Sequence, residues 1–91
     1  MVRHFLDDDI EYQIWLAGHP SGYVVNCERH PKPNYLVLHR ADRTTINGTP
    51  SHGGRWTHDY RKVCAATPVE LEAWARDTIR TTPSRCGVCQ P

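Results

Sequence analysis

The chain opens with a helical pattern of apolar residues. Ile10, Ile14 and Ala17 are spaced four and three apart, which places them on one face of a helix over residues 8–17, with Trp15 and Leu16 alongside. Asp8 stands at the expected cap, and a glutamate three residues later completes a capping box. A glycine and a proline directly after this stretch predict its end. A strand is the alternative, but the stretch does not alternate between apolar and polar residues.

Three runs rich in β-branched and aromatic residues follow, and they predict strands. The prolines in His30-Pro31-Lys32-Pro33-Asn34 cannot donate ladder hydrogen bonds, so this segment is expected to join the first two runs as a hairpin loop. Residues 40–58 are polar and rich in turn formers, which predicts a long loop, with a further short strand possible at 55–57. The predicted strands are 22–27, 35–39 and 60–65.

A second helix is predicted by Thr67-Pro68-Val69-Glu70, where threonine caps, proline takes the first turn and glutamate completes a capping box. Leu71, Trp74, Ala75 and Ile79 then form a helical apolar stripe, with the tryptophan as a core anchor. The chain is therefore expected to be an α+β protein. It would have an N-terminal helix, a three- or four-stranded mostly antiparallel sheet and a C-terminal helix.

The length of 91 residues predicts one domain, residues 1–91, with a small core. No apolar run approaches the ~20 residues of a membrane span, and no leader precedes the first helix. A cytoplasmic chain with reduced thiols is therefore the preferred interpretation, although the four cysteines could instead form two disulfides.

Two cysteines near the carboxyl end, Cys86 and Cys89, have the spacing that contributes half of a tetrahedral zinc site. Cys64 closes the last predicted strand and His39 closes the second, so both are candidates for the other half. A zinc ion held by His39, Cys64, Cys86 and Cys89 would tie the tail to the sheet and stabilise a small core. We therefore expect Zn²⁺ as the cofactor.

Three other residues compete for these roles. Cys27 is the alternative fourth cysteine ligand, although a small buried side chain in the first strand is its more ordinary role. His52 and His58 could take the place of His39 as the nitrogen ligand.

Charge is unevenly distributed, although the net charge is only +1. Residues 1–28 carry one arginine and five acids, a balance of −4, whereas residues 29–62 carry seven cations and two acids, a balance of +5. A basic, histidine-rich middle suits a polyanion such as a nucleic-acid backbone, and a solvated loop face is the alternative.

The order of these motifs resembles a known zinc module. Leu38-His39-Arg40-Ala41-Asp42-Arg43, a capped helix and the terminal Cys86-x-x-Cys89-x-Pro91 are similar to the zinc-bearing N-terminal domain of Ada-type DNA alkyl-repair proteins. That module has a His or Cys, three residues and a Cys before its helix. Arg43 stands at the position of this Cys, so either Cys64 replaces it or the metal is lost. The methyl-acceptor chemistry of that family is therefore not implied here.

A second resemblance covers Trp15-Leu16-Ala17-Gly18-His19-Pro20-Ser21-Gly22-Tyr23-Val24-Val25-Asn26. This stretch is similar to small uncharacterised actinobacterial domains, some of them linked to nucleic-acid processing or restriction. Together the resemblances imply a DNA-binding module, with modified-DNA recognition or defence as its context.

The sequence thus predicts a zinc-stabilised module that binds nucleic acid, DNA rather than RNA. Lysines and arginines would contact phosphates, and Tyr35 or Trp56 would stack on a base. The predicted contact residues are Arg40, Arg43, Asn47, Arg55, Trp56, Arg61 and Lys62.

Two other functions remain open. A protein-interaction or structural module, with a protein partner, fits the near-neutral net charge. A small metal-dependent nuclease is suggested by histidines near an asparagine in the long loop, namely His39, Asn47, His52 and His58.

Overall fold

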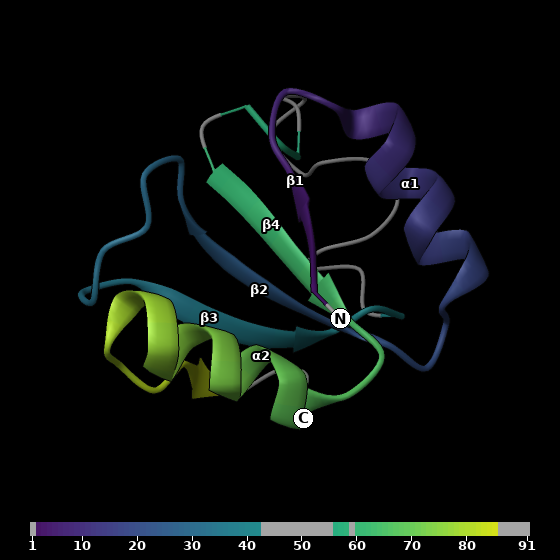
Figure 1. Ribbon diagram of the computed structural model, residues 1–91. Helices are drawn as coiled ribbons and strands as arrows, with labels where there is room; N and C mark the ends of the chain where they lie inside the picture. The colour runs from purple at the N-terminus through teal and green to yellow at the C-terminus, as the bar shows by residue number, and fades with distance from the viewer. Residues whose placement is uncertain (1, 43–55, 59, 86–91) are drawn as a thin grey trace.

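A computed structural model describes residues 2–42, 56–58 and 60–85 of the chain (Figure 1). Its elements follow the order β1 (Arg3–Phe5), α1 (Asp9–Gly18), β2 (Tyr23–Glu28), β3 (Leu36–Arg40), β4 (Tyr60–Ala65), α2 (Pro68–Trp74), a π-helical segment (Ala75–Ile79) and β5 (Ser84–Arg85). The strands form one sheet in the order β1-β4-β2-β3-β5. All neighbours are antiparallel except β3 and β5, which are parallel.

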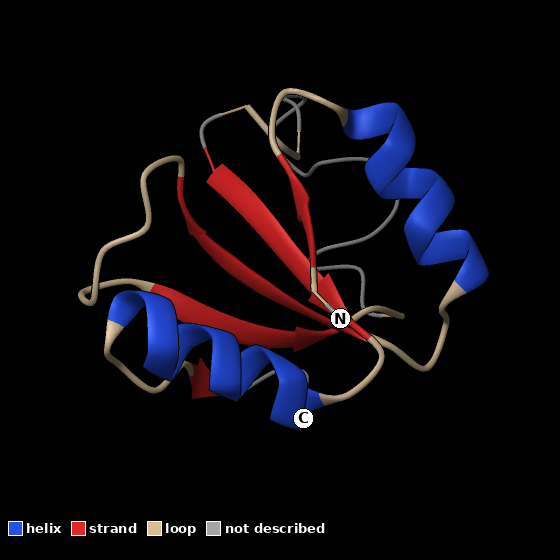
Figure 2. Ribbon diagram, viewed as in Figure 1, coloured by secondary structure: helices blue, strands red, loops and turns tan. Residues whose placement is uncertain are grey.

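The sheet is covered by one helix on each face (Figure 2). Alternate residues of a strand point to opposite faces, so neighbouring positions in β2 and β4 enter different clusters. Val24 and Cys64 pack with α1, whereas Val25 and Val63 pack with α2. This division gives two small cores in place of one large one.

Helix α1 begins at the predicted cap, since the Asp8 carboxylate accepts a hydrogen bond from the Glu11 amide (3.1 Å). Its buried side, however, carries Tyr12, Trp15 and Leu16. The expectation was correct for Trp15 and Leu16 and wrong for Ile10 and Ile14, which are 76% and 58% exposed. The two rings and the leucine bury a larger apolar area than the isoleucines would, so the helix turns that side to the sheet.

Helix α2 confirms the predicted capping box. The Thr67 hydroxyl accepts from the Glu70 amide, and the Glu70 carboxylate accepts from the Thr67 amide. The helix buries Leu71, and Trp74 is half-buried with its ring edge against the His4 ring (5.4 Å between centroids). Burial and the nearby Arg61 charge both lower the pKa of His4.

The predicted α+β class is confirmed, and the sheet is mostly antiparallel as expected. The order of elements differs, because a strand precedes the first helix and the sheet has five strands in place of three or four. Strands β1 and β5 are three and two residues long, too short to show a sequence period. At the possible strand 55–57, Trp56 and Thr57 form a bend, and Arg55 lies outside the described residues. Within the described residues, no helix has the length and hydropathy to cross a membrane.

Candidate nucleic-acid interface

Lys62, on β4, lies at the centre of a polar cluster on the α1 face of the sheet. Its side chain is only 3% exposed. The ammonium donates to the Asn26 Oδ1 atom (2.6 Å) and to the Trp56 carbonyl (2.7 Å), and it lies 5.6 Å from the Tyr60 ring centroid. Burial lowers the pKa of Lys62 to about 8, because water no longer solvates the charge. The buried Lys62 ammonium therefore holds the Asn26 side chain and the Trp56 carbonyl in place.

The segment over Lys62 is held by the first turn of α1. The Asp9 carboxylate accepts from the Trp56 amide, the Thr57 amide (both 2.8 Å) and the Thr57 hydroxyl (2.5 Å). The Thr57 hydroxyl in turn accepts from the Asp8 amide at 2.8 Å. Thr57 is fully buried, so these bonds form away from competing water. Trp56 is therefore tied to the helix through its amide and to Lys62 through its carbonyl.

Two exposed tyrosines lie beside this cluster. Tyr35 precedes β3 and Tyr60 begins β4, and their rings meet at 5.8 Å between centroids with a 50° tilt. The Tyr35 hydroxyl accepts from the Asn26 amide group at 3.2 Å. Tyr35 is 37% exposed and Tyr60 is 44% exposed, so both rings are open to a ligand. We refer to Tyr35 and Tyr60 as the tyrosine platform.

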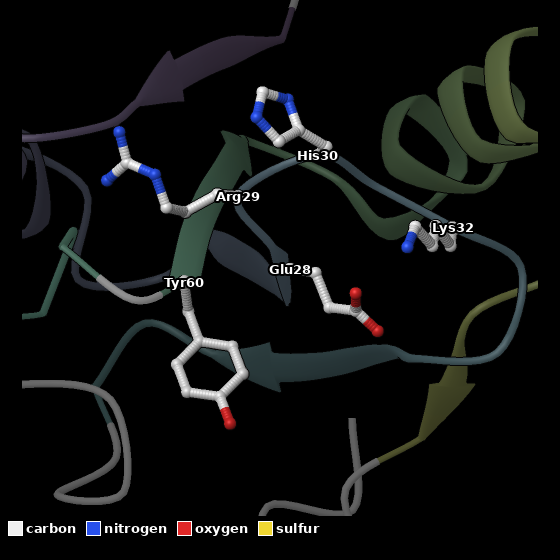
Figure 3. A pocket seen from close by; sticks show the side chains of 5 residues that line it. All are labelled: Glu28, Arg29, His30, Lys32 and Tyr60. Carbon is white, nitrogen blue, oxygen red and sulfur yellow. The ribbon is translucent and has the colours of Figure 1, made fainter.

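A cleft of about 460 Å³ adjoins the platform, lined by Glu28, Arg29, His30, Lys32 and Tyr60 (Figure 3). Glu28 pairs directly with Tyr60 across β2 and β4, so their side chains share a face. Figure 3 shows Glu28 between Tyr60 and Lys32, whereas Arg29 and His30 extend toward the opposite side. The cleft therefore combines a ring, a carboxylate and an ammonium group.

Arg29, which follows β2, makes contacts that stabilise the fold. Its guanidinium makes a bidentate pair with the Asp7 carboxylate at 2.9 and 2.8 Å and also donates to the His58 carbonyl. The bond from Arg29 lowers the pKa of Asp7 well below its usual range. The Arg29 carbonyl accepts from Nε of Arg61 at 3.0 Å.

The predicted nucleic-acid contacts are only partly brought together. Trp56 and Lys62 share the polar cluster, but Arg61 lies beside His4 and Arg40 pairs with the nearby Asp42 (3.4 Å). A phosphate contact by Lys62 would need Trp56 to move. Three predicted residues, Arg43, Asn47 and Arg55, lie outside the described residues.

Half of the predicted zinc site can be placed. His39 on β3 and Cys64 on β4 both pair with Val24 on β2, the strand between them, so they share one face of the sheet. Two strand spacings separate them, which puts their Cα atoms about 10 Å apart. Burial and the Lys62 charge lower the pKa of His39, which favours the neutral form of the ring that binds metals. Cys64 is fully buried among apolar side chains, and burial raises the pKa of its thiol.

The other half of the zinc site, Cys86 and Cys89, lies outside the described residues. No group of three metal-binding side chains occurs within the ranges that the structure describes. Cys27, the alternative ligand, is buried in the α2 cluster, and burial raises the pKa of its thiol to about 11. The zinc site stays a prediction.

The histidines of the possible nuclease site are not assembled in the described part of the chain. His39 lies on β3, whereas His58 is exposed with its Nδ1 atom 3.3 Å from the Asp7 carboxylate. Asn47 and His52 lie outside the described residues. The described histidines therefore give no support to the nuclease hypothesis.

Sequence reasoning missed Tyr60 and Glu28. The two-residue period of β4 places Tyr60, Lys62 and Cys64 on one face, and the same period in β2 places Glu28 beside Tyr60. Once β2 is known to pair with β4, this two-residue period is enough to place Glu28 beside Tyr60. The pairing itself joins strands more than thirty residues apart, and no local pattern specifies it.

Comparisons of this chain with protein-family models, with curated proteins and with solved structures found no match, so both sequence resemblances stay untested.

Proposed function

We propose that the chain is a nucleic-acid-binding module that takes single-stranded DNA on the tyrosine platform. The observation that carries this proposal is the pair of exposed rings, Tyr35 and Tyr60, beside a cleft with a lysine at its rim. Bases stack on aromatic side chains whatever their identity, and a cation beside the rings attracts the phosphates. Asn26 and Lys62 fix the platform from below, which reduces the ordering required on binding.

The context expected from the sequence belongs to the same proposal. A base splayed from a strand presents its whole edge, so this interface would also serve recognition of modified DNA or a defence role. Cys27 and Cys64 are free thiols, which suits the reducing cytoplasm that we propose as its location.

Replacing Tyr60 with leucine is expected to weaken binding of a fluorescent nine-residue oligothymidylate about tenfold, because stacking on one ring contributes about 1–3 kcal/mol. Tyr60→Phe is the matched control, since it keeps the ring and should retain the affinity. Fluorescence anisotropy at several salt concentrations measures both variants, and affinity should fall as salt rises.

Three results separate the outcomes of this experiment. Absence of binding to DNA at low salt would contradict the proposal. Stronger binding of the matching RNA would identify RNA, in place of DNA, as the ligand. Equal affinity of the leucine variant and the wild-type protein would place the DNA elsewhere on the molecule.

A zinc-tied tail remains part of the proposal. Arg85 pairs with Leu38, the neighbour of His39, so the chain that leads to Cys86 reaches the edge of β3 beside a candidate ligand. Elemental analysis of protein purified without chelator is expected to find zinc, and Cys89→Ser is expected to remove it and lower stability. A zinc-free wild-type protein would contradict this expectation.

Cys64→Ala decides the role of the buried thiol in the same measurement. Loss of zinc would confirm Cys64 as a ligand. Retained zinc with reduced stability would identify it as a core residue, because deleting a buried group leaves a cavity.

One observation favours the alternative of a protein-interaction module. Ile10 and Ile14 are exposed one helical turn apart on the outer side of α1, with Ala17 also exposed. A partner protein that covers this side would bury them.

A further inference from the structure

We infer that the cleft beside the tyrosine platform is a guanine site, in which the Glu28 carboxylate reads the Watson–Crick edge of a base stacked on Tyr60. This inference rests on the proposed function and names the nucleotide that the site prefers. Three features of the cleft support it: the position of Glu28, its lack of partners and the nature of the groups around it.

Glu28 is placed to reach the edge of a base on Tyr60. The two residues are direct cross-strand partners at the ends of β2 and β4, where such pairs have Cβ atoms about 5 Å apart. The Tyr35 ring meets the Tyr60 ring at 5.8 Å between centroids, and the Glu28 side chain lies beside Tyr60 (Figure 3). A base lying on the rings would bring its edge toward the carboxylate.

The Glu28 carboxylate is available to a ligand. Among the described residues it accepts no hydrogen bond and forms no ion pair, in contrast to Asp7 and Asp9, which are both engaged. Its side chain is half-buried, so water competes less strongly for it than on an open surface. The cleft has a volume of about 460 Å³, within the range of roughly 300–1,000 Å³ of ligand pockets.

An ionised carboxylate only accepts hydrogen bonds, and this property selects among the bases. Guanine presents two adjacent donors, N1–H and the N2 amino group, which match the two carboxylate oxygens. Adenine and cytosine each place a ring-nitrogen acceptor beside their amino group, and that acceptor would face a carboxylate oxygen. Thymine offers a single N–H between two carbonyl oxygens, so guanine alone satisfies both oxygens without repulsion.

Lys32 completes the site. It is exposed on the loop after β2, on the far side of Glu28 from Tyr60, and it makes no ion pair with a described residue. An ammonium there would contact a phosphate of the nucleotide whose base occupies the cleft. The arrangement places stacking, edge recognition and charge on three successive sides of one nucleotide.

The test compares nine-residue DNA strands of thymidines that differ only at the central base, measured by fluorescence anisotropy. The guanine strand is expected to bind about tenfold more tightly than the adenine, cytosine and thymine strands, the size of one good bidentate contact. A hypoxanthine strand separates edge recognition from stacking, because hypoxanthine stacks as a purine but lacks the N2 amino group. It is expected to bind with intermediate affinity.

The variant Glu28→Gln removes the charge and one acceptor and is expected to reduce the guanine preference to within twofold. Glu11→Gln makes the same change on the exposed side of α1 and should leave the preference intact. Circular dichroism confirms that both variants are folded.

Each outcome bears on a different claim. If the wild-type protein binds no strand, the proposed function fails. If it binds all strands equally, the guanine site is overturned and the proposed function stands. A guanine preference that persists in the glutamine variant would overturn the role of Glu28.

Discussion

Replacing Asp9 with alanine is expected to lower the free energy of unfolding by about 4 kcal/mol. The Asp9 carboxylate accepts three hydrogen bonds, one from the Trp56 amide and two from the amide and hydroxyl of Thr57, whose side chain is fully buried. Hydrogen bonds to charged groups contribute about 1.5–3 kcal/mol each, and stranding a buried donor costs about 1–3 kcal/mol. A chain of this length has a total stability of about 5–14 kcal/mol, so the loss is large.

Urea denaturation followed by circular dichroism measures this change. Asp9→Asn keeps one carbonyl oxygen as an acceptor and should lose less stability than Asp9→Ala. Asp77→Ala is the matched control, because Asp77 is an exposed helical acid and its removal should change stability by no more than about 0.5 kcal/mol. A loss below 1 kcal/mol for Asp9→Ala would mean that the segment at Trp56 is held by other contacts.

The second large effect concerns Lys62 and depends on pH. The pKa of Lys62 is lowered from 10.5 to about 8, so between these values the unfolded chain binds a proton that the folded chain does not. The Lys62 contribution to stability is therefore fully present above pH 10.5 and is lost as pH falls through 8. The free energy of unfolding of the wild type, taken relative to that of Lys62→Met, should rise by about 1.4 kcal/mol for each pH unit between 8 and 10.

The comparison with Lys62→Met isolates this lysine from other groups. Burial raises the pKa values of Cys27 and Cys64, so both thiols lower the stability of either protein above pH 9, and the difference leaves only the interaction of these thiols with the Lys62 charge. A constant gap for the Lys62 variant would mean that water reaches the ammonium in the folded protein.

The parts of the fold that were predictable from sequence are specified by neighbouring residues. The strand at 60–65 was predicted with its observed limits, and the cap at Thr67 was correct because it depends on four consecutive residues. The buried side of α1 was predicted only in part, since spacing alone cannot rank Ile10 and Ile14 against Trp15. Packing against the sheet decides that choice, and the sheet is assembled from distant strands.

The candidate site was predictable only in part for the same reason. Lys62 was expected at the surface because charged residues in a strand usually face water. Its burial depends on Trp56, whose position depends on Asp9, 47 residues earlier in the chain. The cleft at Glu28 likewise requires the pairing of β2 with β4.

The short outer strands have a consequence for behaviour at high concentration. A sheet edge with unpaired backbone groups can recruit the same edge of another molecule and start a fibril. In the part of the sheet that the structure describes, the outer strands are β1, with three residues, and β5, with two, and each carries an exposed arginine. Such short edges offer few backbone groups for pairing with another copy, so concentrated solutions of the folded protein should resist amyloid formation.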